Sequence, residues 1–297
     1  MTDIRQSPYW SEFMKELGWG VEKIGKKDQK QFVFLKKIPL LGTVLKSPRI
    51  ATPIPFTEID ELAQESKAAF AKIEPNHTSS DKSLFAALAQ NSFLPERWSL
   101  HPTKTIIIDL RKGENELLAN MEKDTRYSIR ASQRRGVRVV KSSDLERFLK
   151  LYRQTAKRQR FWIAEAELRL LWEIFSNEGK AFILIAQWNK ADIAGCLILH
   201  YDKKAYYYHA ASIRHLGELF APYLLVWEAM LKSKALKLKE LDLEGIYDPR
   251  IPTTSKWRGF SHFKKGFRGE EVELAGSFVK TYNPLAKLLF KFGNFSF

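Results

Sequence analysis

Residues 257–273 carry the side chains best suited to chemistry, in the segment WRGFSHFKKGFRGEEVE. The segment sets four cations among four aromatic residues: Arg258, Lys264, Lys265 and Arg268 among Trp257, Phe260, Phe263 and Phe267. Cations and rings on glycine-containing backbone suit a bound anion, or a reaction intermediate that develops negative charge. The alternative is a surface hairpin whose lysines are solvated, because charge runs usually form exposed faces.

A second group of cations recurs along a predicted helix over residues 114–135. Arg126, Arg130 and Arg134 follow one another at four-residue spacing, so they share one face of the helix. Such a stripe could follow a phosphate backbone, and it could equally be a solvated outer face. The spacing alone leaves both interpretations open.

Other familiar chemistries are missing from the sequence. The six histidines are scattered, without an HExxH motif or a Cys/His cluster, so we expect no metal site. The chain has no Walker A loop, no dinucleotide-type GxGxxG and no GxSxG elbow. Cys196 is the only cysteine, and it lies in the apolar run AGCLILHY, which predicts a small buried hydrophobic residue.

Composition indicates a globular protein with a polyanionic partner. Of 297 residues, 44% are apolar and 28% are charged, which fits one large domain or two of ordinary size. The net charge of +15 favours nucleic acid, a phosphorylated substrate or anionic lipid. No run approaches the roughly 20 apolar residues of a membrane span, and the N-terminus lacks an apolar signal core. We therefore expect a cytoplasmic protein.

The elements that must position these residues occur twice in a similar order. Each half has a helix, antiparallel strands, a long helix and a further strand, which predicts two copies of one α/β fold and no doubly wound parallel sheet. Predicted strands lie at 19–25, 31–37, 43–49, 71–75, 105–109, 181–187, 192–201, 204–211 and 241–244, with 271–279 extended. Predicted helices lie at 8–16, 57–71, 83–90, 114–135, 143–157 (with a capping box from Ser143 to Glu146), 165–177, 222–237 and 284–292.

Six strings in order resemble the FemABX family of peptidyltransferases. They are IEP (73–75), HPTKTIIIDL (101–110), ELLANMEKDTRYSIRASQRRGVRV (116–139), LYRQTAKRQRFW (151–162), APYLLVWEAM (221–230) and HFKKGFRGEEVELAGSFVKTYNPL (262–285). The string at 116–139 is the most diagnostic of them. Together they cover most of the chain.

The resemblance implies two tandem GNAT-like domains, an α/β (α+β) architecture of the acyl-CoA N-acyltransferase fold. We expect the first domain at 1–141 plus 275–297, with the C-terminal helix returning to it, and the second at 142–274. The chain resembles the compact form of the family, without a helical arm. The implied activity is transfer of an amino acid from aminoacyl-tRNA to the stem peptide of a peptidoglycan precursor, UDP-MurNAc-pentapeptide or lipid II, without a cofactor.

The resemblance also implies roles for individual residues. Phe263 and Lys264 match the position that stabilises the oxyanion, with Lys265 the residue most easily confused with Lys264. Asp109 matches a candidate base, although its place at a strand end favours capping the next helix. The residues expected to contact the acceptor are Arg49, Arg158, Trp162, Tyr208 and Lys265. The residues expected to hold tRNA are Arg126, Arg130 and Arg134.

Two other functions fit parts of the sequence. An acyl-CoA-dependent N-acyltransferase would need a Gln/Arg-x-x-Gly-x-Gly/Ala loop at a helix start, and QRRGVR (133–138) fails at its last position. A non-catalytic protein that binds RNA or a membrane surface would explain the charge. The tail LAKLLFKFGNFSF (285–297) could then touch a bilayer at the inner face of the membrane, although docking onto the first domain is the simpler expectation.

Overall fold

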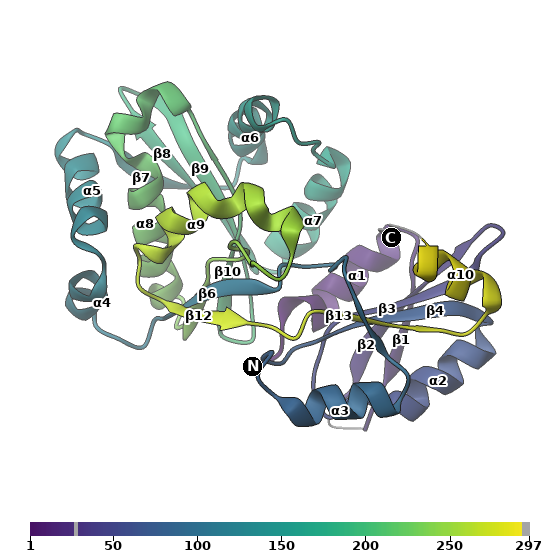
Figure 1. The fold of residues 1–297 in the computed structure, drawn as a ribbon. Helices are drawn as coiled ribbons and strands as arrows, with labels where there is room; N and C mark the ends of the chain where they lie inside the picture. Colours follow the sequence, from purple (N-terminus) through teal and green to yellow (C-terminus); the bar gives the residue numbers. More distant parts are fainter. Residues whose placement is uncertain (27–28, 293–297) are drawn as a thin grey trace. The chain divides into compact units, whose positions relative to one another are not determined.

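The computed structural model describes residues 1–26 and 29–292, and it divides the chain into two compact units (Figure 1). The first unit comprises residues 2–104 together with 272–297, and the second comprises residues 105–271. Residues 293–297, which include the end of the tail considered for membrane contact, lie outside the described residues.

The first unit is built on a six-stranded sheet in the order β1-β2-β3-β4-β13-β5. In Figure 1, α2 and α3 lie on one face of this sheet, and α1 and α10 lie on the other. Its elements are η1 (Ile4–Gln6), α1 (Pro8–Glu16), β1 (Gly20–Ile24), β2 (Gln31–Ile38), β3 (Gly42–Ile50), α2 (Phe56–Glu65), β4 (Ala68–Pro75), α3 (Lys82–Gln90), β5 (Leu94–Glu96), β13 (Ser277–Thr281) and α10 (Pro284–Phe292).

The C-terminal segment completes the first unit. Strand β13 pairs antiparallel with both β4 and β5, so the chain returns to the sheet that its N-terminus began. On α10, Ala286 is buried and the Phe290 ring meets Phe70 edge-on at 4.9 Å between centroids. The described part of the tail therefore docks on the first unit.

The second unit is built on a seven-stranded sheet in the order β12-β6-β11-β10-β9-β8-β7. Helices α5 and α8 pack against each other on one face, and α6 packs on β9 and β10. Its elements are β6 (Lys104–Asp109), α4 (Glu114–Asn120), α5 (Lys123–Arg134), β7 (Arg138–Ser142), α6 (Leu145–Gln159), α7 (Glu165–Asn177), β8 (Ala181–Trp188), β9 (Ala191–Tyr201), β10 (Lys204–Ser212), η2 (Arg214–Leu219), α8 (Ala221–Ala235), β11 (Glu240–Asp242), η3 (Pro252–Trp257), α9 (Arg258–Lys265) and β12 (Glu270–Glu273).

The division between units differs from our prediction at the first boundary. We predicted residues 105–141 in the first domain, and the structure groups them with the second unit. The reason is pairing: β6 forms an antiparallel ladder with β11, and α5 packs against α8. Motif order along the chain does not reveal such long-range contacts.

Several element boundaries also differ. The helix predicted over 57–71 ends at Glu65, because Lys67 takes a left-handed backbone with φ of 51° and β4 then begins. The helix predicted over 114–135 is two helices, since Met121 is extended (φ −64°, ψ 157°). Asp144 rather than Ser143 caps α6, accepting a hydrogen bond from the Glu146 amide at 2.9 Å.

Candidate functional site

The segment 257–273 is helical where the alternative interpretation expected a hairpin. Helix α9 carries Phe260, Phe263, Lys264 and Lys265, and β12 follows after Gly269. Close packing fixes the C-terminal end of α9, because a Cβ atom added at Gly266 would overlap Oγ1 of Thr125 on α5. The Gly266 carbonyl also accepts a hydrogen bond from the Glu122 amide at 2.9 Å. The helix is therefore anchored one residue after Lys265.

Lys264 points its ammonium at the turn after β11. Its Nζ donates to the carbonyl oxygens of Gly245 at 2.8 Å and Glu244 at 3.3 Å, and it lies 4.9 Å from the centre of the Phe260 ring. Burial lowers the pKa of Lys264 to about 8, against the opposing attraction of the Glu244 and Asp242 carboxylates. Carbonyl groups of the described residues thus accept hydrogen bonds from two of the three N–H groups of the half-buried Lys264 ammonium.

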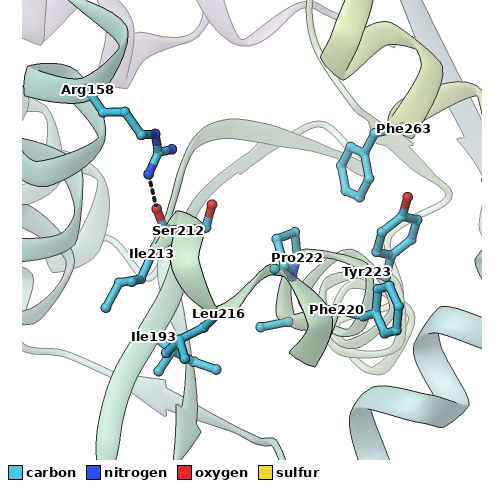
Figure 2. A pocket seen from close by; sticks show the side chains of 11 residues that line it. Arg158, Ile193, Ser212, Ile213, Leu216, Phe220, Pro222, Tyr223 and Phe263 are labelled. Carbon is cyan, nitrogen blue, oxygen red and sulfur yellow. Dashed lines mark hydrogen bonds between the residues drawn. The ribbon is translucent and has the colours of Figure 1, made fainter.

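Phe263 faces a cavity of about 280 Å³ (Figure 2). Its ring meets Tyr223 edge-on at 4.8 Å and Phe267 at 5.4 Å between centroids. Arg158 lies across the cavity, where Nη1 donates to the Ser212 carbonyl at 2.7 Å. The cavity is lined mainly by apolar side chains from the loop before α8 and from the start of that helix. It can hold a flat or apolar group beside α9.

The neighbouring cations of the segment are used differently from Lys264. Lys265 is exposed and pairs with Glu271 at 2.7 Å, and Arg268 pairs with Glu122 at 3.1 Å. Arg258 lies over the Tyr247 ring, 4.6 Å from its centre. Lys264 is the more buried of the two lysines, and its hydrogen-bond partners differ from the ion-pair partner of Lys265.

Asp109 does not cap the helix that follows it, so that expectation is wrong. Gly113 is the N-cap of α4, and Asp109 instead accepts from the backbone amide and the guanidinium of Arg111. These hydrogen bonds lower the pKa of Asp109 below its ordinary value. An acid held ionised in this way is a weak base.

Besides Lys265, three residues predicted to contact the acceptor lie in the second unit. Arg158 is exposed near the end of α6, and Trp162 follows it with 83% of its surface exposed. Tyr208 is half-buried at a bulge in β10, where the register shifts between Tyr207 and His209. The two preceding tyrosines of β10, Tyr206 and Tyr207, are both buried.

Arg49 belongs to the first unit, at the end of β3. It is 4% exposed, its Nη2 donates to the Pro102 carbonyl at 2.5 Å, and its Nη1 has no hydrogen-bond partner among the described residues. The same unit buries Glu74, which accepts from Leu100, His101 and Ser277. A buried guanidinium with an open donor is suited to an anion.

The arginine stripe on α5 is only partly free. Arg126 donates to the carbonyls of Ala119, at 3.1 Å, and Met121, so it satisfies the end of α4. Arg134 lies 5.9 Å from the Tyr127 ring centre, and Arg130 is exposed. Two of the three predicted tRNA contacts therefore remain available on the surface.

The loop before α8 supplies cavity residues that sequence reasoning missed. Ile213, Leu216 and Phe220 line the cavity. Leu216 lies in the 3₁₀ helix η2, and Ile213 and Phe220 cap its two ends. The loop reads RHLGEL (214–219), which places Arg and Gly as a pyrophosphate loop would but ends in the buried Leu219. The Arg-x-x-Gly spacing of this loop can be read from the sequence just before a helix, and it is an alternative to the string at 133–138.

Among residues 1–26 and 29–292, no group of three or more His, Cys, Asp or Glu side chains could hold a metal ion. In that same part of the chain, no helix combines the length and the apolar character that a membrane span requires.

Comparisons with known proteins identify the fold from solved structures and the family from a family model. Three solved structures share the fold. FemX has a TM-score of 0.84 and 19% identity, with 97% of this chain and 94% of FemX covered. L-PGS from Bacillus licheniformis has a TM-score of 0.55 and 12% identity, with 96% of each chain covered, and a tandem GNAT protein from the clavulanic acid biosynthesis pathway has a TM-score of 0.50 and 11% identity, with 85% of this chain and 79% of that protein covered. These likenesses confirm the predicted tandem GNAT-like fold. No curated protein sequence matches significantly. The FemAB family model matches residues 97–192 and 176–294, well over half of the chain, and this protein therefore belongs to the FemAB family.

Proposed function

We propose that this protein transfers an amino acid from aminoacyl-tRNA to an amine of the stem peptide of a peptidoglycan precursor. Membership of the FemAB family supports an aminoacyltransferase of peptidoglycan bridge formation. The observation that carries the proposal is Lys264: a half-buried ammonium with one N–H left over, next in sequence to the Phe263 ring of the cavity.

The reaction is aminolysis of an ester. The acceptor amine attacks the aminoacyl carbonyl carbon, and the carbonyl π electrons move to oxygen to give a tetrahedral oxyanion. The C–N bond forms, the oxyanion collapses, and the C–O bond to the ribose breaks. The proton lost by the amine goes to the departing ribose oxygen, so no protein base is required. Asp109, with its lowered pKa, is assigned no proton-transfer role.

Lys264 stabilises the intermediate in this proposal. Two N–H groups are held by the Gly245 and Glu244 carbonyls, which fix the direction of the third. A charged donor already in place where negative charge develops costs no reorganisation in the transition state. Removing one such donor typically costs a factor of about 10² to 10³ in kcat.

Charge and an open hydrogen-bond donor or an exposed ring support the residues proposed to bind the acceptor. Arg49, with its open Nη1, and Arg158, at the cavity rim, are the candidates for the phosphates of the acceptor. The exposed Trp162 offers a ring for stacking, and Tyr208 and Lys265 are further candidates. Arg126, Arg130 and Arg134 on α5 remain candidates for the tRNA arm, with Arg126 the weakest because the carbonyls of Ala119 and Met121 engage it.

An acyl-CoA-dependent N-acyltransferase is the second candidate. The loop RHLGEL before α8 favours it, whereas Leu219 in place of the final Gly or Ala disfavours it, because a side chain there keeps backbone amides from a pyrophosphate. A binding protein without catalysis is the third candidate, and the net charge of +15 supports it.

The deciding experiment offers the purified protein a pool of radiolabelled aminoacyl-tRNAs with UDP-MurNAc-pentapeptide or with lipid II. Label in either product supports the proposal, and the productive pair identifies the donor and the acceptor. Acetyl-CoA turnover on an amine, with no label in either precursor, would instead assign the acyl-CoA reaction. Tight tRNA binding without any turnover would assign the binding role.

A further inference from the structure

A second hollow lies along α6, next to the cavity beside Phe263. This hollow has a volume of about 540 Å³ and lies between α6 and the turn that joins β8 to β9. Ile213 lines both the cavity and the hollow, so the two are neighbours on the second unit. We call the cavity and the hollow together the α6 groove. Figure 2 shows its cavity end, with Arg158 and Ile213 on one side and Tyr223 and Phe263 on the other.

One face of α6 forms a wall of the groove. Arg147, Lys150, Gln154 and Arg158 line it at spacings of three and four residues, so they form one stripe. At 1.5 Å of rise per residue, the stripe runs about 16 Å. That length covers several stacked nucleotides, whose spacing along a strand is about 3.4 Å.

The hollow, which is the far end of the groove from Phe263, is lined by several cations. Arg147 is held by Asp192 in a two-pronged ion pair at 2.7 and 2.8 Å, and Gln187 donates to the same carboxylate. Lys150 and Lys190 are exposed and form no ion pair with any described residue. Arg147 forms the ion pair with the carboxylate of Asp192, which Lys150 also attracts, so the lining of the hollow carries more positive than negative charge.

The near end of the groove is aromatic. Phe220, Tyr223 and Phe263 are half-buried and line the cavity, with Arg135 placed 5.1 Å from the centre of the Phe220 ring. Phe263 is the neighbour of Lys264 in α9. A base stacked on these rings would contact α9 at the residue that precedes the proposed oxyanion donor.

We propose that the α6 groove binds the single-stranded 3′ end of the aminoacyl-tRNA, with the terminal base among the aromatic rings and the preceding phosphates beside Lys150 and Lys190. This inference rests on the proposed function and specifies the path of its donor substrate. Proteins bind single-stranded nucleic acid by the same combination of stacking rings and a basic channel. The arginines on the face of α5 suit the sugar-phosphate backbone of a duplex instead.

The test compares two double variants that each remove two positive charges from the second unit: Lys150→Ala with Lys190→Ala, and Arg130→Ala with Arg134→Ala. The RNA probes are a labelled hairpin with a four-nucleotide single-stranded 3′ extension and the same hairpin with a blunt end. Fluorescence anisotropy measures the Kd of each pair over a range of salt concentrations. Thermal unfolding verifies that both variants are folded.

We expect the lysine variant to bind the extended hairpin at least about tenfold more weakly, with the salt slope of log Kd reduced by about 1.4 for two lost single-strand phosphate contacts. Its affinity for the blunt hairpin should equal that of the wild type. The arginine variant should lose affinity for both hairpins by the same factor, because both probes contain the duplex. An equal loss on both hairpins in the lysine variant, or no loss on either, would overturn the inference.

Two further outcomes keep this inference separate from the proposed function. Wild-type transfer activity with an unchanged KM for aminoacyl-tRNA in the lysine variant would overturn the groove assignment alone. A wild type that neither binds the extended hairpin nor transfers label would overturn both. A loss of affinity for phosphatidylglycerol vesicles, with RNA affinity intact, would reassign the groove to a membrane surface.

Discussion

The Lys264 ammonium lies 2.8 Å from the carbonyl oxygen of Gly245, so a turn after β11 fixes a cation carried by α9. This contact makes Lys264 a directed donor, whereas Lys265 one residue later pairs with Glu271 on the surface. Adjacent lysines thus have different physical roles, and that difference can be measured.

Lys264→Ala should lower kcat for amino acid transfer by about 10² to 10³, since it removes the donor to the oxyanion. The Kd for aminoacyl-tRNA should change little, because the proposed contact forms only in the intermediate. Lys265→Ala is the matched control, and its kcat should stay within about twofold of the wild type because surface ion pairs contribute little. Single-turnover transfer and anisotropy binding measure the two quantities. Equal losses in both variants would mean that the lysines merely contact tRNA.

The transfer rate should fall on the alkaline side of a pH near 8. Burial lowers the pKa of Lys264 to about 8, and the charged form is the donor. Stabilisation of the oxyanion is therefore present below pH 8 and lost as the pH rises through it. Lys264→Arg, which stays charged, should remove this decline even if its overall rate is lower. A decline near pH 8 that persists in the arginine variant would belong to another group.

The regular elements of the second unit were largely predictable, because their alternation of apolar and polar residues survives in the fold. Strands β8, β9 and β10 and helix α7 agree closely with the predicted ranges. Phe263 and Lys264 were named from a resemblance, yet nothing in the sequence placed Phe263 beside Ile213 and Phe220. Ile213 and Phe220 flank a 3₁₀ helix, whose position depends on tertiary packing rather than on a periodic pattern.

Helix α9 shows why local reasoning failed at the centre of the site. The two glycines within and after it, Gly259 and Gly266, suggested a turning backbone. At Gly266 the structure uses the absence of a side chain for close contact with Thr125, with an ordinary helical φ of −58°. A sequence does not distinguish a glycine needed for space from one needed for a turn.

The buried carboxylate of Glu74 should make the first unit sensitive to acid. Burial raises the pKa of Glu74, but the charge and hydrogen bond of His101, with Arg49 and Ser277, outweigh it and bring the pKa to about 2. A folded pKa below the unfolded value of about 4.3 stabilises the unit above that value, and this stability is lost as the pH falls towards 2. The shift corresponds to about 3 kcal/mol.

Glu74→Gln should flatten the dependence of the unfolding free energy on pH between about 4.5 and 2. Glu96→Gln, on β5 of the same sheet, is the control: its half-buried carboxylate accepts a hydrogen bond from the Trp98 amide at 3.1 Å and attracts the Lys72 ammonium. Urea unfolding at a series of pH values gives both free energies. A pH dependence that survives in the Glu74 variant would show that other carboxylates control the acid response.

The contact between Gly266 and Thr125 offers a test of how α9 is positioned. Gly266→Ala should lower both stability and kcat, because the new Cβ would overlap Thr125 Oγ1 and push α9, with Lys264, away from α5. Thr125→Ala in the same chain clears that space, so the double variant should recover most of the lost activity. Gly259→Ala in the same helix meets no atom within 4 Å and should leave activity unchanged. Gly269→Ala would meet the Ile107 carbonyl, which no side-chain change can remove, so Thr125→Ala should not rescue it. This account of the packing would be contradicted if Thr125→Ala restored the activity of Gly269→Ala. It would also be contradicted if Thr125→Ala failed to restore the activity of Gly266→Ala.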